Sequence, residues 1–244
     1  MGVGTVAHAQ APGEQERAER VGQQLYQLDR ALNAANVAGQ DLRAFRRSDE
    51  ITGWVSGRRE GDTWLTFVGE SKKQGPISLF QVAITASGTP VGEMQRLDEE
   101  PLSGDLLVQY NARKLAEALP RTQCATQTDI LLIPESTPAG SVWQAYVLPH
   151  STFNDVLMLG GSLRVTVAAD GTRVDASKAL GGDACTVVPN PADAPSLQVS
   201  DGSSAGPNEV HVYLSLRAGK PLYVIDGARR WLVQDGHIRS LPNG

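Results

Sequence analysis

The chain has 244 residues, of which 41% are hydrophobic and 20% charged, and its formal net charge is −5 at pH 7. This balance is typical of a globular protein and lacks the clustered lysines and arginines of nucleic-acid or anionic-membrane binding, so we expect neither partner. No segment approaches the ~20 consecutive apolar residues of a membrane-spanning helix, so no integral membrane segment is predicted. The length allows a sizeable core, and we expect residues 10–244 to form a single α+β domain.

The first residues resemble the end of a secretory signal peptide. Ala7, His8 and Ala9 match the small-x-small pattern of a cleavage site, which predicts cleavage after Ala9 and makes residues 1–9 a signal-peptide remnant. Residues 1–9 lack the positively charged region of a signal peptide, and their apolar run is short. Either the true start of the coding sequence lies upstream or the match is accidental. On the first explanation the protein is periplasmic or secreted.

Export decides how the only two cysteines are interpreted. In an oxidising compartment Cys124 and Cys185 are expected to form a disulfide, which by the chain-entropy model stabilises the fold by roughly 4 kcal/mol. In the cytosol the same residues would be buried thiols. A reactive nucleophile is the third alternative, and neither cysteine lies in a recognisable catalytic signature.

The first half of the chain reads as a helix, a β-meander and a second helix. Apolar residues recur at helical spacing over residues 13–38, and Gly39 follows where a C′ glycine belongs. Three strand-like runs separated by short turns come next, at residues 53–59, 63–70 and 76–85. Residues 86–102 read as a connection. Ser103 is then placed to cap a helix at about residues 104–119, which Pro120 ends.

The second half reads as strands joined mostly by hairpins. Residues 129–134 and 142–148 precede a hairpin that turns on Asp170-Gly171, a dipeptide suited to a two-residue type I′ turn. In that register Val167 faces Val174 and Val165 faces Ala176. Residues 189–208 are the longest irregular segment, with a short strand at residues 197–199.

Three more strands are predicted after that segment, at residues 209–217, 221–226 and 230–239. The last is split by Asp235-Gly236 into a tight hairpin that pairs Val233 with Ile238. The sum is an α+β fold with two helices and about ten strands in a largely antiparallel sheet.

The strand predicted at residues 209–217 carries the best candidates for chemistry. Alternation places four polar side chains on one of its faces: Glu209, His211, Tyr213 and Ser215. These groups suit acid–base or metal chemistry if His150 or Asp129 lies close. The alternative is a partly exposed sheet face with a hydrogen-bonded histidine. No HxH, HExxH or CxxC spacing is present, so we predict no metal site and no cofactor.

Several segments of the second half resemble a known group of proteins. They are Leu159-Gly160-Gly161, Ala184-Cys185-Thr186, the run from Pro207 to Leu216, and the run from Lys220 to Val224. Together they resemble uncharacterised exported proteins of proteobacteria. The resemblance implies export and an α+β fold but no activity, and no functional residue is carried over from it.

Three functional hypotheses follow from these observations. The first is an exported, non-catalytic protein that binds another protein or a cell-envelope component. The second is a hydrolase or metal-dependent enzyme that uses Glu209, His211 and His150, and it requires these side chains to converge in one cleft. The third, an inhibitor or immunity protein for a toxin, is not separable from the first by sequence.

Overall fold

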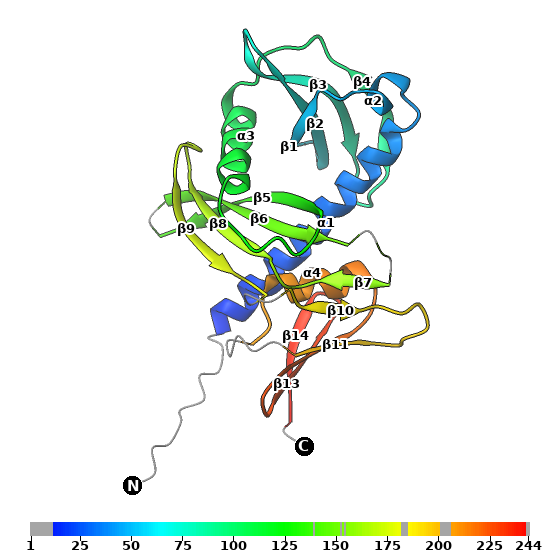
Figure 1. The fold of residues 1–244 in the computed structure, drawn as a ribbon, viewed down its shortest axis with the longest axis vertical. Coiled ribbons are helices and arrows are strands. Elements are labelled where there is room, and N and C mark those ends of the chain that lie inside the picture. The colour runs from blue at the N-terminus through cyan, green and yellow to red at the C-terminus, as the bar shows by residue number, and fades with distance from the viewer. Residues whose placement is uncertain are drawn as a thin grey trace.

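A single long helix organises the computed structural model, which describes residues 12–138, 140–151, 153, 155–181, 185–200 and 206–242. This helix, α1 (Pro12–Gly39), passes three four-stranded sheets that follow one another along its axis (Figure 1). All but one of the strand pairings are antiparallel. The predicted α+β class and the N-terminal helix are therefore confirmed. The predicted cleavage site after Ala9 lies outside the described residues.

The first sheet, at the C-terminal end of α1, is the predicted meander with one more strand. Its order is β1 (Ile51–Arg59), β2 (Asp62–Ser71), β3 (Gly75–Ile84) and β4 (Pro90–Arg96). The prediction of a plain connection over residues 86–102 is wrong, because β4 lies there. β4 is an edge strand in which only Met94 is buried, so it has no apolar alternation to reveal it. The short helix α2 (Arg43–Arg46) packs its Phe45 against this sheet.

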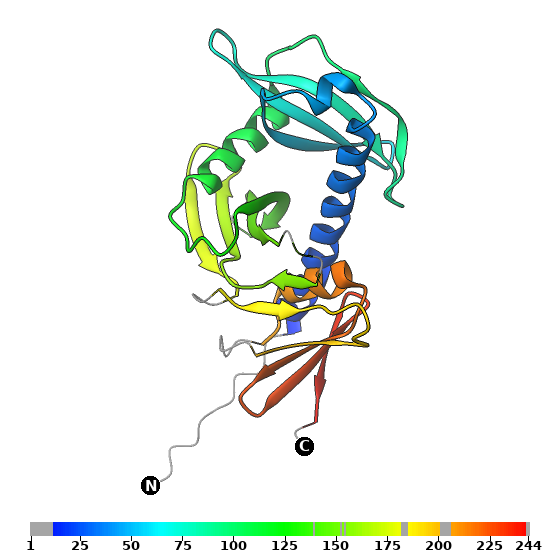
Figure 2. The same ribbon diagram turned by 45° about the vertical axis from the view of Figure 1, so that its right-hand side comes forward.

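The second sheet lies beside the middle of α1. Its order is β5 (Gln127–Thr137), β6 (Gly140–His150), β8 (Leu163–Ala168) and β9 (Val174–Ala179). Helix α3 (Gly104–Glu117) bridges the first and second sheets, as Figure 2 shows. The Gln109 amide bonds both main-chain groups of Ser56 on β1, and Arg113 donates to the Ile130 carbonyl on β5. Ser103 is the N-cap residue of α3, but its side chain makes no capping hydrogen bond.

The β8–β9 hairpin differs from the predicted two-residue turn. Val167 faces Val174 as predicted, but a register shift places Ala176 opposite Thr166, so the predicted pairing of Ala176 with Val165 is wrong. The Ala168 N–H bonds the Arg173 carbonyl, which leaves a four-residue loop. The Asp170 carboxylate accepts bonds from the Thr172 N–H and hydroxyl and holds this wider turn.

The third sheet lies near the N-terminal end of α1. It contains β11 (Leu197–Ser200), β12 (Leu222–Asp226), β13 (Arg229–Gln234) and β14 (His237–Leu241), with β11 parallel to β12. A separate pair is formed by β7 (Val156–Met158) and β10 (Val187–Pro189). The predicted tight hairpin is confirmed: Asp235 and Gly236 have φ values of 52° and 83°, and Val233 faces Ile238.

The predicted strand at residues 209–217 is wrong, because this segment is helix α4 (Glu209–Ala218). The Asn208 side chain accepts from the Val210 N–H, and the Asn208 N–H donates to His211 Nδ1, which closes a capping box. Gly219 ends the helix in the left-handed conformation, with φ of 64°. The predicted exposed sheet face does not exist, since α4 is buried from Glu209 to Ser215.

The predicted disulfide between Cys124 and Cys185 is present and joins residues 61 positions apart. The disulfide also explains why position 161 is a glycine. Gly161 has φ of 79°, and a Cβ there would lie 2.8 Å from the Cys124 sulfur, so the bridge packs directly on this glycine.

One hydrophobic cluster runs along α1 and reaches all three sheets. It contains Leu25 of α1, Phe67 of β2, Leu131 of β5, Val212 of α4 and Val224 of β12. Among the described residues, no helix has both the length and the apolar character needed to cross a membrane.

Candidate functional site

Glu209, the first of the predicted site residues, belongs to a buried ion network. It is 3% exposed, and one carboxylate oxygen accepts bonds from Arg164 (2.8 Å), Tyr146 (2.9 Å) and Arg17 (3.1 Å). Arg17 also forms a bidentate pair with Glu135 at 2.7 and 3.0 Å. The network joins α1, α4 and the second sheet, and each ion in it has an oppositely charged partner.

The electrostatics of the network keep Glu209 ionised. Burial alone would raise the pKa of Glu209, but the charges of Arg164 and Arg17, the hydrogen bond from its own backbone and that from Tyr146 outweigh it, and the pKa lies below its usual value. Burial and the nearby Glu209 carboxylate raise the pKa of the Tyr146 hydroxyl well above its usual value. A carboxylate paired in this way with two guanidinium groups acts as a structural counter-ion.

His211, the second candidate, caps a helix. It is fully buried, and its Nδ1 accepts the Asn208 N–H within the capping box of α4. Glu209 contacts Arg17, Tyr146 and Arg164. His211 contacts the Asn208 backbone, and His150 contacts Asp129 and Arg217. The period-two face on which their proposed cooperation depended is absent, so the structure does not bring the three together through that face.

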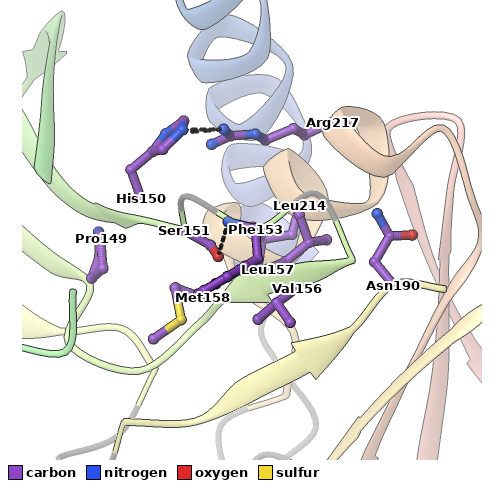
Figure 3. Close-up of a pocket in the computed structure, with 10 residues that line it drawn as sticks. All are labelled: Pro149, His150, Ser151, Phe153, Val156, Leu157, Met158, Asn190, Leu214 and Arg217. Carbon is purple, nitrogen blue, oxygen red and sulfur yellow. Dashed lines mark hydrogen bonds between the residues drawn. The ribbon is translucent and has the colours of Figure 1, made fainter. Parts of the chain in front are cut away.

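His150, the third candidate, lines a pocket of about 200 Å³ where the end of β6, β7 and α4 meet (Figure 3). Its Nδ1 lies 3.0 Å from Asp129 Oδ2 and 3.0 Å from Arg217 Nη2. The remaining lining is largely apolar. The ten lining residues are Pro149, His150, Ser151, Phe153, Val156, Leu157, Met158, Asn190, Leu214 and Arg217.

Behind His150 and Arg217 lie two further polar groups that sequence analysis did not select together. Arg217 Nη1 donates to the Tyr213 hydroxyl at 2.7 Å. Asp29 of α1 is 3% exposed, and burial raises its pKa above the usual 3.8, a rise that the charge of Arg217 only partly offsets. The wall of the pocket is therefore cationic, with its acidic counter-charges behind the lining.

A larger cleft of about 660 Å³ lies between α1 and α3, with β1 on one side and the ends of β5 and β6 on another. Figure 2 shows the course of α1 and α3, the two helices that contribute to its lining. Its lining combines carboxamides and hydroxyls with apolar side chains and one indole. Representative lining residues are Gln24, Gln27, Leu28, Ser56, Thr63, Gln109, Leu132 and Trp143.

The Gln24 side chain gives this cleft an unsatisfied acceptor. Its Oε1 is buried and has no hydrogen-bond partner in the part of the chain that the structure describes. A buried carbonyl without a donor costs about 1–3 kcal/mol. Gln24 therefore places an acceptor without a partner among the described residues in the wall of the cleft.

One residue that the sequence analysis missed carried a readable signal. Asp29 lies four residues after Leu25 and three before Leu32, on the stripe of α1 that packs into the core. An acid on an apolar stripe needs a buried partner. Arg217 and Gln109 carried no such signal, since their roles depend on contacts between distant segments.

Comparisons with protein-family models, curated proteins and solved structures found no match to this chain. Within the described residues there is no group of three or more His, Cys, Asp or Glu side chains placed to hold a metal ion.

Proposed function

We propose that this protein is an exported, non-catalytic binding protein that holds an extended segment of a partner protein in the cleft between α1 and α3. The observation that carries the proposal is the pairing of Gln109 with Ser56 on the edge strand β1. The Gln109 amide accepts the Ser56 N–H at 3.1 Å and donates to the Ser56 carbonyl at 2.8 Å. These are the two bonds that a peptide group of a neighbouring strand would make.

The geometry of β1 extends this pairing into the cleft. Main-chain groups two residues apart on a strand point to the same side, so those of Arg58 face the same free edge as those of Ser56. Arg58 and Gly57 both line the cleft, and β1 is the outermost strand of its sheet. An extended peptide can therefore continue along β1 from the position that Gln109 occupies.

The side chains of the cleft favour binding rather than reaction. Its titratable lining residues in the described chain are Arg30, Arg58 and Asp105, which are suited to charge recognition. The carboxamides of Gln24 and Gln27 suit the N–H and C=O groups of a peptide, and Trp143 offers apolar contact area.

Two observations support export. The Cys124–Cys185 disulfide is of the kind that persists in oxidising compartments such as the periplasm. The Ala7-His8-Ala9 sequence has the pattern of a signal-peptidase site.

The cleft is tested by filling it at Gly57. A Cβ at this position meets no atom within 4 Å, so a larger side chain starts from open space. Displayed libraries of unstructured twelve-residue peptides serve as the probe. We expect peptides selected on the wild type to bind Gly57→Ala with similar affinity and Gly57→Trp at least about tenfold more weakly.

Gly57→Ala is the matched control, because both substitutions remove the same glycine from β1. A difference in peptide affinity between the two variants therefore reports on the indole in the cleft and not on the loss of glycine from the strand. Equal binding of the selected peptides to Gly57→Trp would show that they bind elsewhere. A library that yields no binder to the folded wild type would also contradict the proposal.

A further inference from the structure

The His150 pocket presents the Arg217 guanidinium and the His150 imidazole to its interior and keeps its acids outside. His150 and Arg217 are lining residues, whereas Asp29 and Asp129 are not. In Figure 3 both side chains lie over a floor that includes Leu157 and Leu214. A ligand in this pocket therefore meets a guanidinium, an imidazole, the polar side chains of Ser151 and Asn190, and the hydrocarbon of the remaining lining residues.

Among the residues that the structure describes, Arg217 lacks the carboxylate partner that Arg17 and Arg164 have in the interior. Arg17 and Arg164 each contact a carboxylate at 3.1 Å or less. Within the described residues, no carboxylate lies in ion-pair distance of Arg217, whose guanidinium bonds Tyr213 and His150 instead. A guanidinium is planar and matches a carboxylate bidentately, so this is the group from which anion recognition is expected.

We propose that this pocket binds a small organic monocarboxylate. The carboxylate pairs with Arg217, and its apolar body packs on Leu157, Leu214 and Met158. The volume of about 200 Å³ equals that of roughly seven waters at ~30 Å³ each, which suits a compact acid rather than a long chain. The pocket shares no lining residue with the cleft between α1 and α3, so the inference is independent of the proposed function.

The contacts of His150 make this site sensitive to protons. Its Nδ1 is equidistant from Asp129 Oδ2 and Arg217 Nη2, at 3.0 Å from each. A protonated Nδ1 donates to Asp129, whereas an unprotonated Nδ1 accepts from Arg217. One nitrogen cannot do both.

Protonation of His150 therefore frees a guanidinium donor and adds a positive charge to the pocket wall. The other titratable or charged groups near the imidazole are Asp129 of β5, Asp29 of α1, and Tyr213 and Arg217 of α4. Both changes favour an anion. The carboxylate thus binds more tightly when His150 is protonated.

The test uses the full chain and isothermal titration calorimetry with benzoate, benzamide and benzylamine. Benzoate stays ionised both at about pH 5.5 and at about pH 8, so a difference between the two values reports on the protein. We expect benzoate to bind about tenfold more tightly at the lower pH, with uptake of a proton that buffers of different ionisation enthalpy reveal. Benzamide and benzylamine should bind at least about tenfold more weakly than benzoate.

Substitutions test which residues cause benzoate binding and its pH dependence. His150→Gln should retain benzoate binding but lose the pH dependence and the proton uptake. Arg217→Gln should weaken benzoate binding by at least about tenfold. Because Arg217→Gln can also disturb folding, the exposed Phe153 at the pocket wall provides a second pair. Phe153→Asp should bind benzoate severalfold more weakly than the neutral Phe153→Ser.

The failing outcomes are equally specific. Benzoate that does not bind the folded protein at millimolar concentration, or binds no better than benzamide, overturns the carboxylate site. Equal affinities of Phe153→Asp and Phe153→Ser do the same. Proton uptake that persists in His150→Gln overturns the assignment of the pH dependence to His150.

Discussion

Replacing Glu209 with glutamine tests the buried ion network with the smallest possible change of shape. Removing one partner of a buried ion pair typically costs about 3–5 kcal/mol. Here Arg17 keeps both oxygens of Glu135, and the side chains of Arg17 and Arg164 are 24% and 22% exposed, so solvent screens part of the loss. We therefore expect Glu209→Gln to lower the free energy of unfolding by about 2–3 kcal/mol.

Urea unfolding measures this change. With an m value of about 3 kcal/mol/M, the midpoint should fall by about 0.7–1 M. Glu117→Gln is the matched control, because Glu117 pairs with Lys114 in solvent and its loss should cost less than about 1 kcal/mol. A midpoint for Glu209→Gln that falls no further than that of Glu117→Gln would refute the reasoning.

The pH dependence of the same variant follows from the lowered pKa of Glu209. A carboxyl whose pKa in the folded state is below its unfolded value contributes stability that is present above the unfolded value and lost as pH falls through the folded one. The usual value is 4.5. The stability difference between wild type and Glu209→Gln should therefore be constant near neutral pH and shrink below about pH 4.5.

Four further predictions concern the disulfide, a cap, a turn and export. A Cys124→Ser/Cys185→Ser double variant should lose about 4 kcal/mol of unfolding free energy, since the bridge spans 61 positions, and denaturation of the oxidised and double-variant proteins measures it. Asn208→Ala should cost about 1 kcal/mol in the same assay through the lost cap of α4. Gly236→Ala should cost about 1 kcal/mol or more, because alanine disfavours φ of 83°. Intact mass spectrometry of periplasmic protein should show a chain that lacks residues 1–9 and two hydrogens, and a full-length reduced chain would contradict export.

Hairpins were predictable where the turn chemistry and the strand register agreed. Asp235-Gly236 takes positive φ at both residues, and the pairing of Val233 with Ile238 follows. Asp170-Gly171 presented the same dipeptide, yet only Gly171 has positive φ there. The difference comes from Thr172, which satisfies the Asp170 carboxylate from within the loop and widens the turn, an interaction that the dipeptide alone does not encode.

Helix α4 was mistaken for a strand because it is buried on nearly all sides. Its apolar residues alternate as they would in a strand, and complete burial removes the polar face that would show a helical period. The ends of the segment held the better signal. Asn208 before Glu209, and Gly219 shortly before Pro221, are the start and stop signals of a helix.

The pockets were beyond sequence analysis for a different reason. The His150 pocket brings Arg217 against His150, 67 positions apart, and the cleft brings Gln109 against Ser56, 53 positions apart. No local pattern specifies such contacts. His150 was selected for its chemistry, but its partner Arg217 was read as a strand end.

The sequence of α1 reflects the three environments that the helix contacts: the core, the cleft between α1 and α3, and the surroundings of the His150 pocket. Val21, Leu25 and Leu32 are core residues. Gln24, Leu28 and Ala31 follow the i, i+4, i+7 spacing of a second stripe, and all three line the cleft between α1 and α3. Asp29 lies on the core-facing stripe between Leu25 and Leu32 and supplies a counter-charge behind the His150 pocket. One turn of this helix therefore contributes to the core, the cleft and the pocket, which is why its apolar stripe is narrow and interrupted by an acid.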